Sequence, residues 1–324
     1  MTDRRDFLKK GLLASGFMGL QRALGATASE GGRLCEGYGP LVKDPKGVLD
    51  LPAGFSYRVI SRRGTPMSDG FQVPGGPDGM AAFAGENGRV ILVRNHELTL
   101  GSAAWGALPH AKSYPENAPC YDSGAEGEVA MPGGTTHLIY NPATGLAEKE
   151  YLSLVGTDRN CAGGLTPWGS WITCEESDIL IDGRGPLHGW CFEVKAHQEG
   201  VQDPVPLKGL GRFRHEAVAV DPATGVVFLT EDRHEGLFYR FVPKVKGDLV
   251  QGGKLQALAI KGRKRSDSRN WHQKDLAEGE KVEIHWIDLE DVDAPKDNLR
   301  IRGERAGATV FARGEGCWLS LIHI

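Results

Sequence analysis

The chain has 324 residues, a formal net charge of −4 and a mean hydropathy of −0.31. The near-neutral balance excludes a nucleic-acid partner held by clustered basic charge, and the hydropathy excludes a membrane bundle. Glycine contributes 45 residues, about twice its usual share of ~7%, and 18 prolines add further breaks. The composition therefore favours many short strands joined by turns over long helices.

The N-terminus is predicted to be an export signal. Arg4 and Arg5 precede a short apolar run, and an Ala-x-Ala pattern ends at Ala28. A basic start, a short apolar stretch and small residues at a cleavage site are the ordered parts of a secretory signal peptide. The paired arginines resemble the twin-arginine signal, so we expect export of this chain by the twin-arginine machinery to the periplasm or the cell exterior, without a stable membrane anchor.

Short β-rich runs, separated by Gly, Pro, Asn and Asp, begin at about residue 50. The predicted strands lie at 89–93, 137–140, 171–173, 190–194, 217–220, 226–230, 237–242 and 282–287. Two related segments, N-P-A-T-G at 141–145 and D-P-A-T-G at 221–225, predict hairpin turns. The polar stretch 246–281 is predicted to be a linker, and its basic run at 261–265 a solvated loop.

One pattern occurs three times along the chain. A glycine, an apolar strand and a carboxylate-rich end follow one another at 88–97, 169–176 and 225–232. Repeated strand units of this kind predict an all-β fold, a β-propeller, in which strands of several blades converge on a central channel. A β-sandwich is the alternative.

Polar side chains gather at these strand ends. They are Asn95, His96, Glu97, Glu175, Glu176, His215, Glu216, Glu231, Asp232 and, later, Glu315. Several carboxylates around one axis repel one another unless cations neutralise them, and hard cations such as Ca²⁺ favour oxygen ligands. The alternative is a set of exposed acids spread over the rim of the fold.

Cys161 lies in N-C-A-G-G, where small residues let a ligand approach the thiol. A buried, inert thiol is the commoner role of a single cysteine, whereas a thiolate ligand would suit iron. The six cysteines form no C-x-x-C pair and do not fix a disulfide pairing. The absence of G-x-S-x-G, P-loop and H-E-x-x-H motifs excludes the common serine hydrolase, P-loop and zincin sites.

Taken together, these motifs resemble the PhoX-type alkaline phosphatases. The most specific segment is N-C-A-G-G-L-T-P-W-G-S-W-I-T-C-E-E at 160–176. The other similar segments follow in order at 77–83, 93–97, 133–138, 211–217, 229–233, 236–243 and 311–316. The resemblance extends from about residue 35 to residue 318.

The resemblance implies a six-bladed β-propeller with Fe³⁺ and Ca²⁺ in a channel site that releases phosphate from small phosphomonoesters. It implies that Cys161 is an iron ligand. The other implied metal ligands are Glu97, Glu175, Glu176, Glu216, Glu231, Asp232 and Glu315. Arg313 and Asn95 are implied to bind the phosphate.

The predicted organisation is a signal peptide at 1–28, a propeller phosphatase domain at 29–318 and a tail at 319–324. The tail, L-S-L-I-H-I, matches a translated transposon adaptor, so we expect a propeller that is incomplete at its C-terminus. We expect a monomer, and little or no activity of this form, because an unclosed propeller leaves an exposed edge and an incomplete site. The alternative functions are a Ca²⁺-dependent hydrolase of lactones or organophosphates, which needs no thiolate, and a non-catalytic periplasmic protein-binding propeller.

Overall fold

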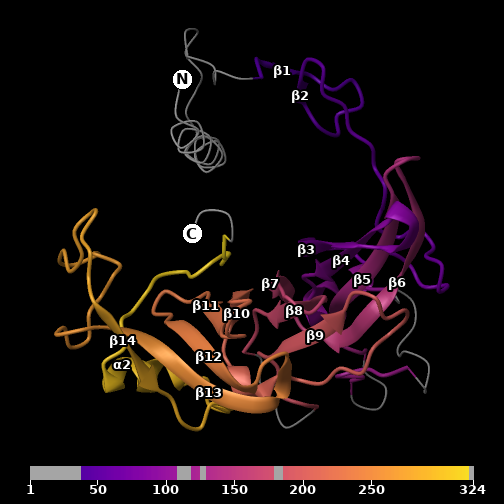
Figure 1. Cartoon of the computed structure of the whole chain (residues 1–324). Coiled ribbons are helices and arrows are strands. Elements are labelled where there is room, and N and C mark those ends of the chain that lie inside the picture. Colours follow the sequence, from indigo (N-terminus) through magenta and orange to yellow (C-terminus); the bar gives the residue numbers. More distant parts are fainter. Residues whose placement is uncertain (1–37, 108–117, 125–128, 179–184, 321–324) are drawn as a thin grey trace. The chain divides into compact units, whose positions relative to one another are not determined.

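The computed structural model describes residues 38–107, 118–124, 129–178 and 185–320 (Figure 1). The predicted signal peptide and the last four residues of the predicted tail lie outside these ranges. The chain divides into two units, residues 1–59 and 60–324. In the first unit, β1 (Leu41–Val42) pairs with β2 (Leu51–Pro52) in an antiparallel ribbon. No helix in the described ranges is long and apolar enough to cross a membrane.

The second unit consists of three antiparallel sheets in which strands that are neighbours in sequence pair with each other (Figure 1). The first sheet contains β3 (Pro77–Ala84), β4 (Val90–His96), β5 (Gly133–Asn141) and β6 (Leu146–Thr157). The second contains β7 (Asn160–Leu165), β8 (Ser170–Glu175) and β9 (Cys191–Lys195). The third contains β10 (His215–Val220), β11 (Val227–Glu231), β12 (Phe238–Val245), β13 (Asp248–Ile260) and β14 (Ile284–Asp288). The described residues also form three 3-10 helices, η1 (Glu86–Gly88), η2 (Leu100–Trp105) and η3 (Lys208–Leu210), and an α-helix, α2 (Leu299–Ala306).

The first strands of the three sheets lie side by side, because β7 contacts both β3 and β10. Two glycines allow this close approach. A Cβ atom on Gly79 would lie 2.8 Å from the Cα of Ala162, and one on Gly164 would lie 2.0 Å from the carbonyl oxygen of Val218. Successive sheets whose first strands adjoin are the blades of a β-propeller, so the all-β prediction is confirmed.

Apolar side chains fill the spaces between neighbouring sheets. One buried cluster joins the second and third sheets and includes Ile172, Val218 and Leu229. Another joins the first and second sheets and includes Val93 and Phe192. Because each sheet buries a face against the next, the loops at the strand ends are held on a rigid frame.

The predicted strands and turns are largely confirmed. All eight predicted runs overlap strands, and the threefold pattern lies on β4, β8 and β11, the second strand of each sheet. The turn at 141–145 joins β5 to β6, and the turn at 221–225 joins β10 to β11. In each turn the initial carboxylate or amide accepts a backbone hydrogen bond, from Ala143 to Asn141 at 2.9 Å and from Ala223 to Asp221 at 3.0 Å.

The prediction of a linker at 246–281 is wrong for its first part. β13 runs through residues 248–260 and lies between β12 and β14 in the third sheet. Its Leu255, Ala257 and Ala259 are buried, but two adjacent glycines and a lysine interrupt the alternating pattern in the sequence. Strands β3, β6 and β7 were also not predicted. β3 and β7 are rich in glycine and alanine, which have weak strand propensity.

Candidate metal centre

The three sheets begin in the same way. The start of each first strand pairs with the last residue of the second strand: Pro77 with His96, Asn160 with Glu175 and His215 with Glu231. In all three sheets the register shifts directly after this pair, so a β-bulge follows. A bulge re-aims the side chain that it carries. The residues that enter the three bulges are Asp78, Cys161 and Glu216, and they occupy equivalent positions.

A second set of equivalent positions follows the second strand of each sheet. It consists of Glu97, Glu176 and Asp232, directly after β4, β8 and β11. The backbone N–H of each donates to the residue that precedes the first strand: Glu97 to Gly76 at 2.7 Å, Glu176 to Arg159 at 3.0 Å and Asp232 to Arg214 at 3.1 Å. The fold thus repeats one pair of side-chain positions in three sheets.

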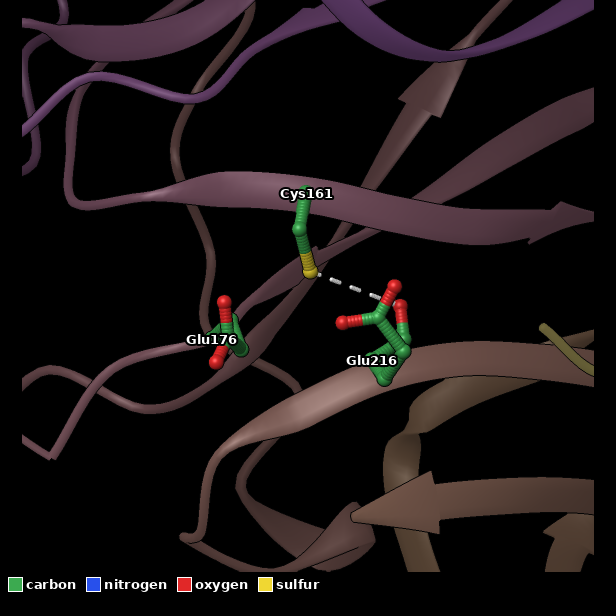
Figure 2. A group of neighbouring side chains, drawn as sticks. All are labelled: Cys161, Glu176 and Glu216. Atoms are coloured by element: carbon green, nitrogen blue, oxygen red, sulfur yellow. Dashed lines mark hydrogen bonds between the residues drawn. The ribbon is translucent and has the colours of Figure 1, made fainter. Parts of the chain in front are cut away.

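These positions bring a thiol and several carboxylates together. Ligand atoms of Cys161, Glu176 and Glu216 all lie within 4.8 Å of one another, and so do those of Glu216, Asp232 and Glu315. Figure 2 shows the first three side chains pointing toward one another from β7, the end of β8 and β10. We call these five residues the acidic cluster. Glu216 belongs to both groups, so it links a sulfur-containing set to an all-oxygen set.

The donor chemistry of the acidic cluster fits bound cations. A thiolate with carboxylates suits a transition metal such as iron, and an oxygen set suits a hard cation such as Ca²⁺. Burial, together with the nearby Glu216 carboxylate, raises the pKa of the Cys161 thiol well above its usual value. A bound cation would reverse this effect, because it favours the deprotonated ligand.

The carboxyl groups of the cluster are also perturbed. Burial raises the pKa of Glu216 to about 7, and the neighbouring acids Glu315, Glu176 and Asp232 add to the rise. Burial and Asp232 raise the pKa of Glu176 to about 7, although Arg159 acts in the opposite direction. The cluster therefore holds protons near neutral pH when no cation is present.

Two arginines border the acidic cluster. Arg313 donates to both oxygens of Asp232, with 2.8 Å between Nη2 and Oδ2, and its Nη2 lies 3.6 Å from Glu315. Arg159 places its Nε 3.2 Å from Glu97 and 3.3 Å from Glu176. Each guanidinium thus bridges two carboxylates.

Glu175 and Glu231 were predicted as metal ligands, but the structure does not bring them into the acidic cluster. Glu175 is buried against His188 at 2.7 Å and accepts three backbone hydrogen bonds. Glu231 is buried and accepts from the N–H of Leu237 and the hydroxyl of Tyr239, at 3.0 and 2.7 Å. Successive side chains of a strand point to opposite faces, so the last residue of the strand turns away where the next one turns toward the cluster.

Asn95 was predicted to bind phosphate. Its side chain is fully buried, and its amide donates to the carbonyl oxygens of Cys161 and Ala162 at 3.0 and 2.8 Å. Its own oxygen accepts from the indole of Trp171 at 2.8 Å. These bonds tie β4 to β7 and fix the strand that carries Cys161. A direct contact of Asn95 with phosphate stays a prediction.

Sequence reasoning missed two residues of the site. Asp78 occupies the bulge equivalent to that of Cys161, and loss of water together with Glu97 raises its pKa to about 6. Arg159 immediately precedes β7. Aligning G-P-D at 76–78, R-N-C at 159–161 and R-H-E at 214–216 would have shown both, because the three segments start equivalent strands.

The comparisons with known proteins agree with this geometry. A family model described as alkaline phosphatase PhoX matches residues 36–322. Among solved structures, Pseudomonas fluorescens PhoX in complex with vanadate, a transition state analogue, is similar, with a TM-score of 0.51 and 17% sequence identity. The match covers 84% of this chain and 64% of that chain, so the sequence spans about two thirds of that protein's length. At this identity the likeness shows the fold, a β-propeller. The comparison with curated proteins gave no match.

Proposed function

Because the chain belongs to the PhoX alkaline phosphatase family, we propose that it hydrolyses small phosphomonoesters at the acidic cluster. The observation that carries this proposal is the convergence of a thiol and carboxylates from equivalent positions of the second and third sheets and from Glu315, beside the guanidinium of Arg313. Anionic groups alone would repel a phosphate, so the site needs cations to bind such a substrate.

We propose that iron binds at Cys161, Glu176 and Glu216, and Ca²⁺ at Glu216, Asp232 and Glu315. Sulfur in the first set favours a transition metal, and the second set offers only oxygen. When bound, such cations supply the positive charge that neutralises phosphate oxygens during phosphoryl transfer. Asp78 and Glu97 would extend the oxygen set at the side of the first sheet.

The chain's own groups orient the substrate. Arg313 has a half-exposed side chain, and its backbone takes a left-handed conformation with φ of 52°. Its N–H donates to the carbonyl oxygen of Arg233 at 2.7 Å, which fixes the start of the side chain beside the cluster. The planar guanidinium then presents paired donors that match two phosphate oxygens. Asn95 fixes the position of β7, which carries Cys161, through its hydrogen bonds to the backbone of Cys161 and Ala162.

We further propose that the protein is exported by the twin-arginine pathway and acts as a monomer on substrates outside the cytoplasm. The residues that predict this signal lie outside the described ranges. A fusion of residues 1–28 to a reporter protein, with Arg4 and Arg5 replaced by lysine in the control, tests the proposal. Export that does not depend on the arginine pair would contradict it.

The proposed activity is tested by metal analysis together with phosphate release from p-nitrophenyl phosphate. We expect iron and calcium in the purified protein, and hydrolysis that falls at least 100-fold in Glu216→Gln, which keeps the size of the side chain but removes the charge shared by both sets. Glu148→Gln is the matched control, because Glu148 pairs with Arg89 on the surface. Calcium without iron, with turnover of a lactone or an organophosphate triester, would indicate the alternative hydrolase, and a protein without metal or turnover would overturn the proposal.

A further inference from the structure

We propose that Arg159 is a second phosphate-binding residue, which Glu97 and Glu176 hold in place until cations take over these two carboxylates. The inference rests on the proposed function, and it adds a residue that contacts Glu97 and Glu176 rather than Asp232 and Glu315. Arg159 would pair with Glu97 and Glu176 in the metal-free chain and with the phosphate of the substrate once cations are bound.

The backbone of Arg159 is fixed at the border of the acidic cluster. The residue lies between the end of β6 and the start of β7. Its N–H donates to the carbonyl oxygen of Leu98 at 2.9 Å, and its own carbonyl oxygen accepts from the N–H of Glu176 at 3.0 Å. These bonds join it to the segments that follow β4 and β8. The Arg159 side chain therefore starts close to the two segments that carry Glu97 and Glu176.

The guanidinium is only partly used. Nε donates to Glu97 at 3.2 Å and lies 3.3 Å from Glu176, and no hydrogen bond joins either Nη atom to any residue in the described ranges. The side chain is 37% exposed, whereas that of Glu176 is 9% exposed. A guanidinium carries five N–H donors in a planar fork. The unused donors are thus accessible from solvent and lie beside the carboxylates that are proposed to bind cations.

The equivalent residues of the other two sheets do not contribute such a charge. Gly76 precedes β3 and has no side chain. Arg214 precedes β10, but its Nε donates to Asp178 at 3.0 Å, outside the acidic cluster. The same backbone position therefore delivers a cationic group to the cluster from the second sheet. Arg313 shows a corresponding arrangement with another pair of carboxylates, because it bridges Asp232 and Glu315.

The charges explain why bound cations would displace the Arg159 guanidinium from Glu97 and Glu176. In the metal-free chain Arg159 reduces the repulsion between Glu97 and Glu176. Cations bound by these carboxylates would compete with the guanidinium for the same oxygens. Its donors would then be free for an anion, and charge-assisted hydrogen bonds from arginine to phosphate are strong. Arg159 should therefore oppose cation binding and favour phosphate binding.

The test uses calorimetric titration of the full chain with Ca²⁺ and, after Ca²⁺ loading, with inorganic phosphate. In Arg159→Met we expect tighter Ca²⁺ binding by about 3–10-fold and weaker phosphate binding by about 10–100-fold, the equivalent of one charged hydrogen bond pair. Arg159→Lys keeps the charge but loses the fork, so we expect near-normal Ca²⁺ binding with phosphate binding reduced. Arg89→Met is the control, because Arg89 has a similar exposure of 35% and pairs with Glu148 away from the site.

The opposite signs separate this role from a structural one. If Arg159 only stabilised the local fold, its loss would weaken both Ca²⁺ and phosphate binding. Weaker or unchanged Ca²⁺ binding in Arg159→Met overturns the inference, and so does phosphate binding equal to that of the unmodified chain. An unmodified chain that binds Ca²⁺ but no phosphate would count against the proposed function itself, and the inference would fall with it.

Discussion

His188 provides a quantitative test of how the centre is supported. It is fully buried, with Nδ1 2.7 Å from Glu175 and Nε2 3.2 Å from Asp122. Burial opposes a charge on the ring, but the Glu175 and Asp122 carboxylates outweigh it and raise the pKa of His188 to about 10. The ring is therefore an imidazolium at neutral pH, and it is the counter-charge of the buried Glu175 that precedes Glu176.

We expect His188→Gln to destabilise the protein by about 3–5 kcal/mol, because it leaves Glu175 buried with neutral donors alone. The rise of the His188 pKa from 6.5 to about 10 corresponds to an upper bound of about 5 kcal/mol. Domains are stable by only about 5–15 kcal/mol, so this change is a large fraction of the total. Urea unfolding at pH 8 in the presence of a chelator measures it.

The stabilisation by His188 should decrease as the pH rises. Since the pKa of His188 is higher in the folded state, its contribution is fully present below pH 6.5 and is lost as the pH rises through about 10. His188→Gln should remove this loss. The control is His137→Gln, because His137 is equally buried but stacks on Tyr151, with no ion pair among the described residues. Equal destabilisation by the two substitutions, or an unchanged slope between pH 8 and 10.5, would refute the reasoning.

Three further outcomes are expected. Cys161→Ser should lose iron and hydrolysis while its unfolding transition stays cooperative, as measured by metal content and phosphate release; full activity would remove the thiolate from the mechanism. Gly79→Ala should lower the free energy of unfolding by about 1–3 kcal/mol, because its Cβ would lie 2.8 Å from backbone atoms of Cys161 and Ala162. The control Gly101→Ala, whose Cβ would lie 3.7 Å from its nearest neighbour, should change this free energy by no more than about 0.5 kcal/mol. Equal unfolding midpoints of the two variants in urea would contradict this expectation. Chelation should lower the melting temperature by roughly 5–10 °C, and added Ca²⁺ should restore part of it. A melting temperature that chelator does not change would show that cations do not hold the cluster together.

The sequence predicted the second strand of each sheet and the first strand of the third sheet, β10, but not the first strands of the other two sheets, β3 and β7. β4, β8 and β11 are apolar runs with a strong strand pattern, whereas β3 and β7 need small residues for close approach and so lack that pattern. The places of β3 and β7 follow from their pairing with β4 and β8, and not from their own sequences. Strand propensity reports packing of side chains, and these strands pack backbone against backbone.

The sequence predicted that several acidic side chains lie close together, but it did not predict which of them face the acidic cluster. Glu175 and Glu176 are adjacent and chemically identical, and only the end of β8 decides which of them faces the cluster. The bulge that presents Cys161 depends on the pairing of Asn160 with Glu175, a contact between strands that local sequence does not show. Such features are set by register, and register follows from the packed sheets.

The bulges that carry Asp78, Cys161 and Glu216 let the side chain change without a change in strand pairing. Each bulge lifts its side chain out of the strand ladder, so the donor atom changes with the side chain while the pairing of the sheet is kept. If the proposed centre forms, replacing the Cys161 sulfur by oxygen would leave a ligand set suited to hard cations alone. On the same proposal, a single substitution in a bulge would change the metal preference of the site while the sheet keeps its pairing.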